Sequence, residues 1–276
     1  MRVRIVTDST ADLPPGWIAE EGITVVPVYV RFGEEVYRDD LEISREVFYR
    51  RLRAGRILPQ TAAPSPGDFE VVYRQLGEEA EVILSIHVAS AFSAVCHAAR
   101  LAAQAITRPR VYVFDSGQVS MGLGWQVRYA ARWAREGSSP EEILRHLQAL
   151  RPRVRLLATV EDVNYLHRSG RIDWIRAFAA ALLHLKPLIE VHEGRATLLE
   201  RVRTWHRAVE RLSEIAAQRT DLEALAILHA DARDAAQDLA RRLQERRAME
   251  IPILQACPAI GAHVGPGAVG IARVER

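Results

Sequence analysis

Val82-Ile83-Leu84-Ser85-Ile86 is a short apolar stretch that ends at His87, and from Ser90 to Ile106 it is followed by apolar residues at helical spacing. Short apolar runs bounded by turn residues are typical of buried strands, whereas a helical period indicates an amphipathic helix. The stretch therefore predicts a strand that leads into a helix. Repeats of this unit build parallel sheets covered by helices.

The same alternation runs through the first half of the chain. Apolar, β-rich runs predict further strands, and between them lie segments whose apolar residues recur at helical spacing. We therefore expect a mostly parallel sheet flanked by helices. The predicted strands are Val3 to Val6, Thr24 to Val30 and Val111 to Phe114, and the predicted helices are Arg45 to Ala54, Asp68 to Leu76 and Gln118 to Arg135.

The second half mixes strands and helices less regularly. Ser139 followed by Pro140 is typical of a helix start, and Glu193-Gly194 indicates the turn of a hairpin. We expect an α/β fold of two domains, residues 1–153 with the parallel sheet and residues 154–276 with a mixed or antiparallel sheet, with a ligand between them. The predicted elements are helices Pro140 to Leu150, Trp174 to Leu185, Trp205 to Gln218 and Ala232 to Arg246, the hairpin Leu188 to Leu199, and strands Val154 to Val160, Leu225 to His229 and Gly267 to Val274.

Three polar side chains each fall where a predicted strand ends. They are Asp8, His87 and Asp115. In open parallel sheets, ligands lie beyond the carboxyl ends of the strands. The sequence therefore predicts a site at this edge of the first sheet.

Composition excludes several classes of function. A net charge of +2 over 276 residues gives no support to a nucleic-acid partner. Cys96 and Cys257 are too few for a disulfide framework or a metal cage. The first apolar run is far too short for a signal peptide, and no run reaches the roughly 18 to 20 apolar residues of a membrane span. We expect a cytoplasmic protein.

A glycine-rich segment near the C-terminus surrounds one histidine. It reads Ala262-His263-Val264-Gly265-Pro266-Gly267-Ala268-Val269-Gly270. Glycine permits close approach and positive φ, and proline fixes φ, so such a turn can hold His263 at a pocket floor with little freedom. The alternative is an ordinary turn that carries a histidine without a role.

Six further segments, spread along the chain, carry a family resemblance. They are Asp8 to Pro14, Thr61 to Pro66, His87 to Ala94, Asp115-Ser116, Tyr165 to Ile172 and Leu185 to Leu188. Together with the segment around His263, they follow the order found in the DegV family of bacterial fatty-acid-binding proteins. The chain resembles this family over essentially its whole length.

The resemblance implies a carrier rather than an enzyme. Such a protein holds a long-chain fatty acid, for example palmitate (hexadecanoate), in a buried apolar tunnel and needs neither another cofactor nor a metal. The family's partner is a fatty acid kinase that phosphorylates the bound acid to an acyl-phosphate. We therefore expect a kinase subunit as the partner of this chain, with at most transient contact with a membrane surface.

Thr61 and Ser93 are the expected carboxylate ligands. In the family, this role belongs to the threonine that opens a Thr-x-x-Pro-Ser-Pro segment and to the serine of a Leu-Ser-Gly-Thr-Tyr segment. Here the second segment reads Phe92-Ser93-Ala94-Val95-Cys96, so the neighbouring hydroxyls are lost and the hydrogen bonds around the ligand change. Ser93 falls in the first turn of the predicted helix, where free N–H groups favour an anion. In another register Ser90 takes the role, and either serine could merely cap the helix.

Two further side chains complete the expected site. By resemblance to the family's His-Val-Gly-Pro-Gly segment, His263 donates to the carboxylate or orients the Ser93 hydroxyl. Arg171 would counter the acid's charge from the second domain, and the alternative is a surface arginine. The expected supporting residues are Ser90, Asp8, Ser9 and Gly265.

The rival hypothesis is a hydrolase or phosphotransferase. It would use Ser93 with His263, or Asp8 with Asp12 and Asp115. The Gly-x-Ser-x-Gly pattern of a nucleophile elbow is absent around Ser93, and the chain has no P-loop. Capping of a turn explains Asp8 and Asp12 more plainly.

Overall fold

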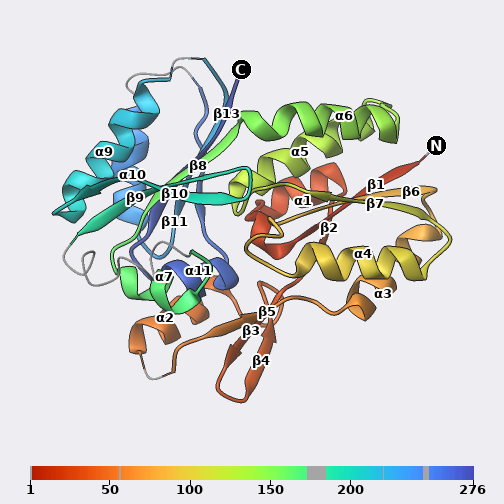
Figure 1. Ribbon diagram of the computed structural model, residues 1–276, viewed down its shortest axis with the longest axis horizontal. Coiled ribbons are helices and arrows are strands. Elements are labelled where there is room, and N and C mark those ends of the chain that lie inside the picture. Colours follow the sequence, from red (N-terminus) through yellow and green to blue (C-terminus); the bar gives the residue numbers. More distant parts are fainter. Residues whose placement is uncertain (1, 56, 173–184, 220, 245–248) are drawn as a thin grey trace.

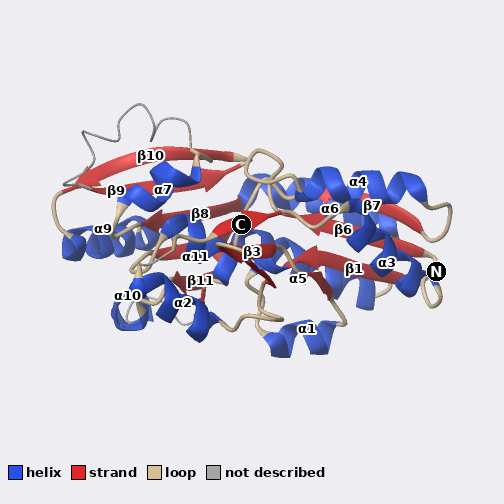
Figure 2. Cartoon of the chain, turned by 90° about the horizontal axis from the view of Figure 1, so that it is seen from below, coloured by secondary structure: helices blue, strands red, loops and turns tan. Residues whose placement is uncertain are grey.

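The computed structural model describes residues 2–55, 57–172, 185–219, 221–244 and 249–276, and these form three sheets with helices on their faces (Figure 1). The two larger sheets lie end to end along the long axis of the molecule (Figure 2). The smallest sheet lies below the junction between them in Figure 1. The predicted α/β fold is confirmed.

The first sheet contains four parallel strands in the order β2-β1-β6-β7. Every residue of β6 is buried, as expected for a strand covered on both faces. Helices α3 and α4 pack on one face, and α5, with α1 and α6 beyond it, packs on the other. The elements are β1 (Val3–Asp8), β2 (Thr24–Val26), β6 (Val82–His87), β7 (Arg110–Asp115), α1 (Pro15–Glu21), α3 (Pro66–Gly77), α4 (Val95–Ala105), α5 (Met121–Arg135) and α6 (Pro140–Leu150), with short 3-10 turns η1 (Ser9–Ala11) and η2 (Arg151–Arg153).

The second sheet contains six strands in the order β10-β9-β8-β13-β11-β12. All neighbours are antiparallel except β11 and β12, so the sheet is mixed. Side chains alternate between its faces: Leu157 packs under α9 and α10, whereas Leu156 and Ala158 line a cavity on the other face. The elements are β8 (Val154–Thr159), β9 (Lys186–His192), β10 (Arg195–Val202), β11 (Leu222–His229), β12 (Ile253–Gln255), β13 (Val269–Glu275), α9 (Trp205–Ala217) and α10 (Arg233–Gln244).

The third sheet is a small antiparallel one, in the order β4-β3-β5. Helix α11 contacts this sheet and also α2, α7 and η1, so it sits where segments from both halves of the chain meet. The elements are β3 (Tyr29–Phe32), β4 (Glu35–Arg38), β5 (Gln60–Ala62), α2 (Arg45–Ala54), α7 (Val163–Ser169) and α11 (Pro258–Val264).

Most predicted elements are present, and the differences have local causes. The predicted strand from Thr24 to Val30 is two strands, because Pro27 has no N–H for strand pairing. The hairpin turns at Glu193-Gly194 as predicted, with positive φ at both residues. Ser139 caps α6 in a capping box with Glu142, as its sequence indicates. The helix predicted from Trp174 to Leu185 lies outside the described residues, apart from its last residue.

The strands divide along the chain much as the sequence suggests. Every strand of the first and third sheets lies within residues 3–115, and every strand of the mixed sheet lies within residues 154–275. One buried apolar cluster nevertheless runs through both parts, from Ile5 to Val274. The division into two domains at residue 153 stays a prediction. Within the described ranges, none of the helices is long and apolar enough to cross a membrane.

Gln118 joins the two larger sheets. It follows β7, is completely buried, and its amide nitrogen donates to the carbonyl of Val154 at 2.9 Å and to that of Val191 at 3.1 Å. Both acceptors belong to the mixed sheet. The side chain therefore fixes the end of β7 against β8 and β9.

Replacing Gln118 with leucine should destabilise the fold, because two buried carbonyl groups lose their donor. Each hydrogen bond contributes about 1 kcal/mol, and each unsatisfied buried group costs about 1–3 kcal/mol, so we expect a loss of about 2–4 kcal/mol in the free energy of unfolding. Urea denaturation measures it. Gln75→Leu, at an exposed position of α3, is the matched control and should change stability by less than about 0.5 kcal/mol. Equal stabilities of the two variants would contradict the role of Gln118.

Candidate functional site

A cavity of about 340 Å³ lies between the carboxyl end of the first sheet and the inner face of the mixed sheet. Its size falls within the roughly 300–1,000 Å³ of small-molecule sites. The loops after β1, β6 and β7 contribute Thr10, Phe92 and Ser120, and the mixed sheet contributes apolar side chains such as Leu156 and Ile189. The lining is mostly apolar, with a few hydroxyl groups, the imidazoles of His229 and His263 and the guanidinium of Arg171.

The sequence placed a site at this edge of the first sheet. Asp8, His87 and Asp115 are indeed the last residues of β1, β6 and β7. They do not themselves line the cavity. The carboxylates of Asp8 and Asp115 accept from residues of the loops that follow β1 and β6, and the His87 ring bonds to the Asp8 carboxylate. The position of the cavity thus follows the rule for ligands of parallel sheets.

Thr61 and His263 meet inside the cavity. Thr61 lies on β5, His263 lies in the last turn of α11, and the Thr61 hydroxyl is 2.8 Å from His263 Nε2. These residues stand 202 positions apart in the chain. Helix α11 and the small antiparallel sheet are what bring them together.

His263 lies on a helix rather than in a turn, which corrects the sequence interpretation. Pro258 occupies the first position of α11, where its missing N–H costs nothing. Gly265, with φ +74°, ends the helix, and its N–H bonds to the carbonyl of Gly261. Gly265 packs against the Tyr165 ring, so close that a side chain could not fit there. The glycines therefore end the helix that carries His263.

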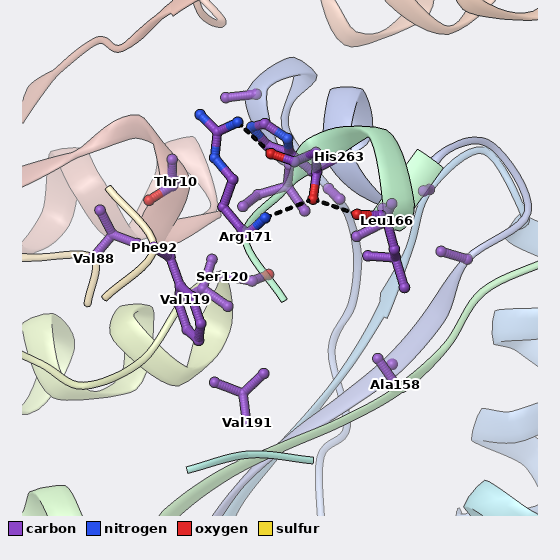
Figure 3. Close-up of a pocket in the computed structure, with 18 of the residues that line it drawn as sticks. Thr10, Val88, Phe92, Val119, Ser120, Ala158, Leu166, Arg171, Val191 and His263 are labelled. Atoms are coloured by element: carbon purple, nitrogen blue, oxygen red, sulfur yellow. Dashed lines mark hydrogen bonds between the residues drawn. The ribbon is translucent and has the colours of Figure 1, made fainter. Parts of the chain in front are cut away.

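The His263 imidazole is neutral at pH 7. Burial, together with the smaller effect of the positive charge of Arg171, lowers its pKa from 6.5 to about 4. Arg171 follows α7, is exposed, and lines the cavity beside His263 (Figure 3). Its Nη1 donates to the carbonyl of Ser169 at 2.6 Å.

Ser93 also lines the cavity, but it precedes α4 instead of lying in its first turn. The predicted helix began at Ser90, whereas α4 begins at Val95. The reason is Asp115, whose carboxylate accepts from both the N–H and the hydroxyl of Ser90 and draws that residue into a turn. The Ser93 oxygen accepts from the N–H of Val95 at 3.4 Å, which leaves its hydroxyl hydrogen available to a ligand.

The expected supporting residues Ser90, Asp8, Ser9 and Gly265 do not line the cavity. Ser90 is held by Asp115 and does not line the cavity. Asp8 is completely buried and accepts from Thr10 and from the His87 ring. Ser9 donates to Asp39 at 2.7 Å. The structure thus brings Thr61, Ser93, Arg171 and His263 together and leaves the other four outside.

Sequence reasoning missed several residues that contribute to the cavity. Thr10 and Ser120 line it, and their hydroxyls donate to Asp8 and Asp12. Thr10 lies within the segment Asp8 to Pro14, so its position could have been anticipated. Ser120 carried no signal, because only its φ of +54° and its bond to Asp12 mark it as special.

The geometry gives little support to the rival hypothesis of an enzyme. The His263 partner is Thr61, and among the described residues no hydrogen bond joins His263 to Ser93. A Ser85-His87-Asp8 chain does exist, with contacts of 2.6 and 2.9 Å, but all three side chains are completely buried. Ser85 also bonds Tyr73 at 2.7 Å, so this chain organises the core.

Comparisons with known proteins agree along the whole chain. The profile of the family described as "Uncharacterised protein, DegV family" matches residues 2–276. A DegV domain-containing protein of Halalkalibacterium halodurans is 34% identical over 276 residues, covering 98% of this chain and 97% of the relative.

Two solved structures are similar to this chain over their whole length. A fatty-acid-binding DegV family protein from Thermus thermophilus superposes with a TM-score of 0.92 at 34% identity. DegV of Bacillus subtilis, described as a fatty acid binding protein, superposes with a TM-score of 0.91 at 30% identity. In both cases the match covers 100% of each chain.

Titration of the ligand-free protein by NMR should show a neutral His263 down to acidic pH. We expect the ring resonances to titrate near pH 4, because burial disfavours the imidazolium. Arg171→Ala should move the midpoint upward without restoring 6.5, because burial is the larger of the two causes. A midpoint close to 6.5 in the parent protein would show that the ring is solvated.

Proposed function

The chain belongs to the DegV family, and on that premise we propose that it binds a long-chain fatty acid in the cavity between its two larger sheets. One observation carries the proposal: a mostly apolar cavity receives Thr61, Ser93 and His263 from three separate segments of the chain. The two similar structures described as fatty-acid-binding support it.

The apolar lining suits the tail of the acid. Each buried methylene contributes about 0.8 kcal/mol, so a sixteen-carbon chain such as that of palmitate offers on the order of 12 kcal/mol before the costs of association. Figure 3 shows Ala158 and Val191 on the side of the cavity opposite His263. The tail would extend from the polar groups toward these residues.

Neutral donors suit the carboxylate. If the neutral His263 carries its proton on Nε2, it donates to the Thr61 oxygen, and the Thr61 hydroxyl is then free to donate to the ligand. Ser93 offers a second hydroxyl hydrogen, since its oxygen already accepts from Val95. Hydrogen bonds to a charged group contribute about 1.5–3 kcal/mol each. The exposed Arg171 guanidinium, which also lines the cavity, supplies a positive charge close enough to affect the pKa of His263.

The proposed role is that of a carrier without catalytic activity. Arg171 is exposed and stands next to His263, so the acid's head would lie near the surface while its tail is buried. A fatty acid kinase could reach a carboxylate held there and form the acyl-phosphate. Such a kinase is the proposed partner, and palmitate is the proposed ligand.

Purified protein should carry a long-chain acid or bind one stoichiometrically. Mass spectrometry of the extracted lipid, followed by calorimetric titration of delipidated protein with palmitate, measures this. We expect one acid per chain, because one cavity holds the proposed donors. Absence of lipid in several preparations, together with no heat on titration, would overturn the proposal.

Thr61→Val and Ser93→Ala should each weaken palmitate binding, because each removes one donor to the carboxylate. The loss of one charge-assisted hydrogen bond corresponds to roughly 10- to 150-fold in the dissociation constant. Thr107→Val, in an exposed loop, is the matched control and should bind as the parent does. Unchanged affinity in both site variants would show that the head is held elsewhere.

A further inference from the structure

Four buried or half-buried side chains from the first fifty residues form hydrogen bonds with residues 255–259, at the start of α11. Arg45 on α2 donates to the carbonyl of Gln255, and the hydroxyl of Tyr49 on the same helix donates to that of Ala256 at 3.0 Å. The carboxylates of Asp12 and Asp39 accept hydrogen bonds from the N–H groups of Cys257 and Ala259. These contacts fix α11, which belongs to the C-terminal half, against the N-terminal half.

Asp12 joins two walls of the cavity. Its Oδ1 accepts from the N–H of Cys257 at 2.7 Å, and its Oδ2 accepts from the hydroxyl of Ser120, which lines the cavity. Arg45 Nη2 is 3.7 Å from Oδ1. Asp12 follows η1 with φ +53°, and only 1% of it is exposed.

Asp39 makes the second attachment. Its Oδ1 accepts from the N–H of Ala259 at 3.3 Å, and its Oδ2 accepts from the hydroxyl of Ser9. The oxygen of Ser9 in turn accepts from the N–H of Val28, another residue of the cavity wall. Only 2% of Asp39 is exposed.

Helix α11 also forms part of the cavity wall. Ala259, Ile260 and His263 of α11 all line it, and His263 holds Thr61. A shift at the start of this short helix therefore displaces the imidazole at its end. The attachment of Cys257 and Ala259 to carboxylates thus controls the geometry of the proposed head-group site.

The two carboxylates are close enough to repel one another. Burial raises the pKa of Asp12 to about 6, against the opposing effect of Arg45. The pKa of Asp39 is raised to about 7, mainly by burial and also by the negative charges of Asp40 and Asp12. The other titratable groups that face the pair are Cys257 and Tyr49.

We propose that Asp12 and Asp39, here called the carboxylate pair, are positioning residues that hold α11 and His263 in place. They do so less firmly once the two carboxyl groups lose their protons. This proposal rests on the proposed function only for its effect on ligand binding. The attachment of α11 itself can be tested without a ligand.

Proton linkage determines how the opening of α11 depends on pH. An opening that lets water reach the carboxylate pair returns both groups toward the ordinary pKa of about 3.9, so the opened state releases protons. Opening therefore becomes more favourable as pH rises through 6 to 7, the values of the closed state. His263 cannot produce this trend, because its pKa lies near 4.

Hydrogen exchange at the amides of Cys257 and Ala259 tests the attachment directly. After correction for the intrinsic rate, the parent protein should open at least about threefold more often at pH 8 than at pH 6. In the same interval, dissociation of the fluorescent cis-parinaric acid, measured by stopped-flow displacement with excess palmitate, should accelerate by a similar factor. Asp39→Asn keeps an acceptor oxygen but cannot ionise, so both trends should flatten.

Two further variants keep the test decisive. Ser9→Ala removes a hydrogen bond that lowers the pKa of Asp39, so it should move the midpoint of both trends to higher pH and serves if Asp39→Asn fails to fold. Glu21→Gln changes a buried carboxylate that pairs with Arg128 and Arg132, remote from α11, and should leave the trends unaltered. Parent-like exchange trends in Asp39→Asn or Ser9→Ala would overturn the proposal. If neither the parent protein nor any variant binds the acid, the proposed function fails. The exchange data then still decide the role of the carboxylate pair.

Discussion

The hydrogen bond between Thr61 and His263 is the contact on which the site depends. It joins a small sheet from the N-terminal half to a helix from the C-terminal half, inside a cavity that neither half encloses alone. Burial there keeps the imidazole neutral. With its proton on Nε2 the ring donates to Thr61, and the threonine hydroxyl is then free to donate to a ligand. The surrounding structure can be understood as the support for this one contact.

Buried carboxylates provide that support without facing the ligand. Asp8 organises Thr10 and the His87 ring, and Asp12 and Asp39 hold the start of α11. None of the three lines the cavity. This separation keeps carboxylates away from the proposed acid, which a neighbouring negative charge would repel. Behind the wall, the carboxyl oxygens accept hydrogen bonds from backbone N–H groups and hydroxyls.

The sequence predicted the regular elements well and the details of the site less well. Apolar runs such as Val82 to Ile86 indicate strands because burial dictates their composition, and the parallel arrangement then locates the site at Asp8, His87 and Asp115. The start of α4 was predicted too early, and α11 was not predicted as a helix. The first depends on a carboxylate, Asp115, that reaches Ser90 only in the folded chain. The second was missed because Gly265 and the turn at Pro266-Gly267 follow the helix directly and were taken to include His263. Asp12 was considered only as a carboxylate of an enzyme or a turn cap, and Asp39 was not singled out. Their contacts with the start of α11 could not be predicted, because they form only when the fold brings segments about 220 to 245 residues apart together.

A crystal structure of the protein with palmitate would test the central claim most directly. We expect electron density for the carboxylate within hydrogen-bond distance of the Thr61 and Ser93 hydroxyls, with His263 Nε2 still bonded to Thr61 and the tail running toward Ala158 and Val191. Density for the carboxylate at the apolar side of the cavity, or a His263 that turns away from Thr61, would contradict it.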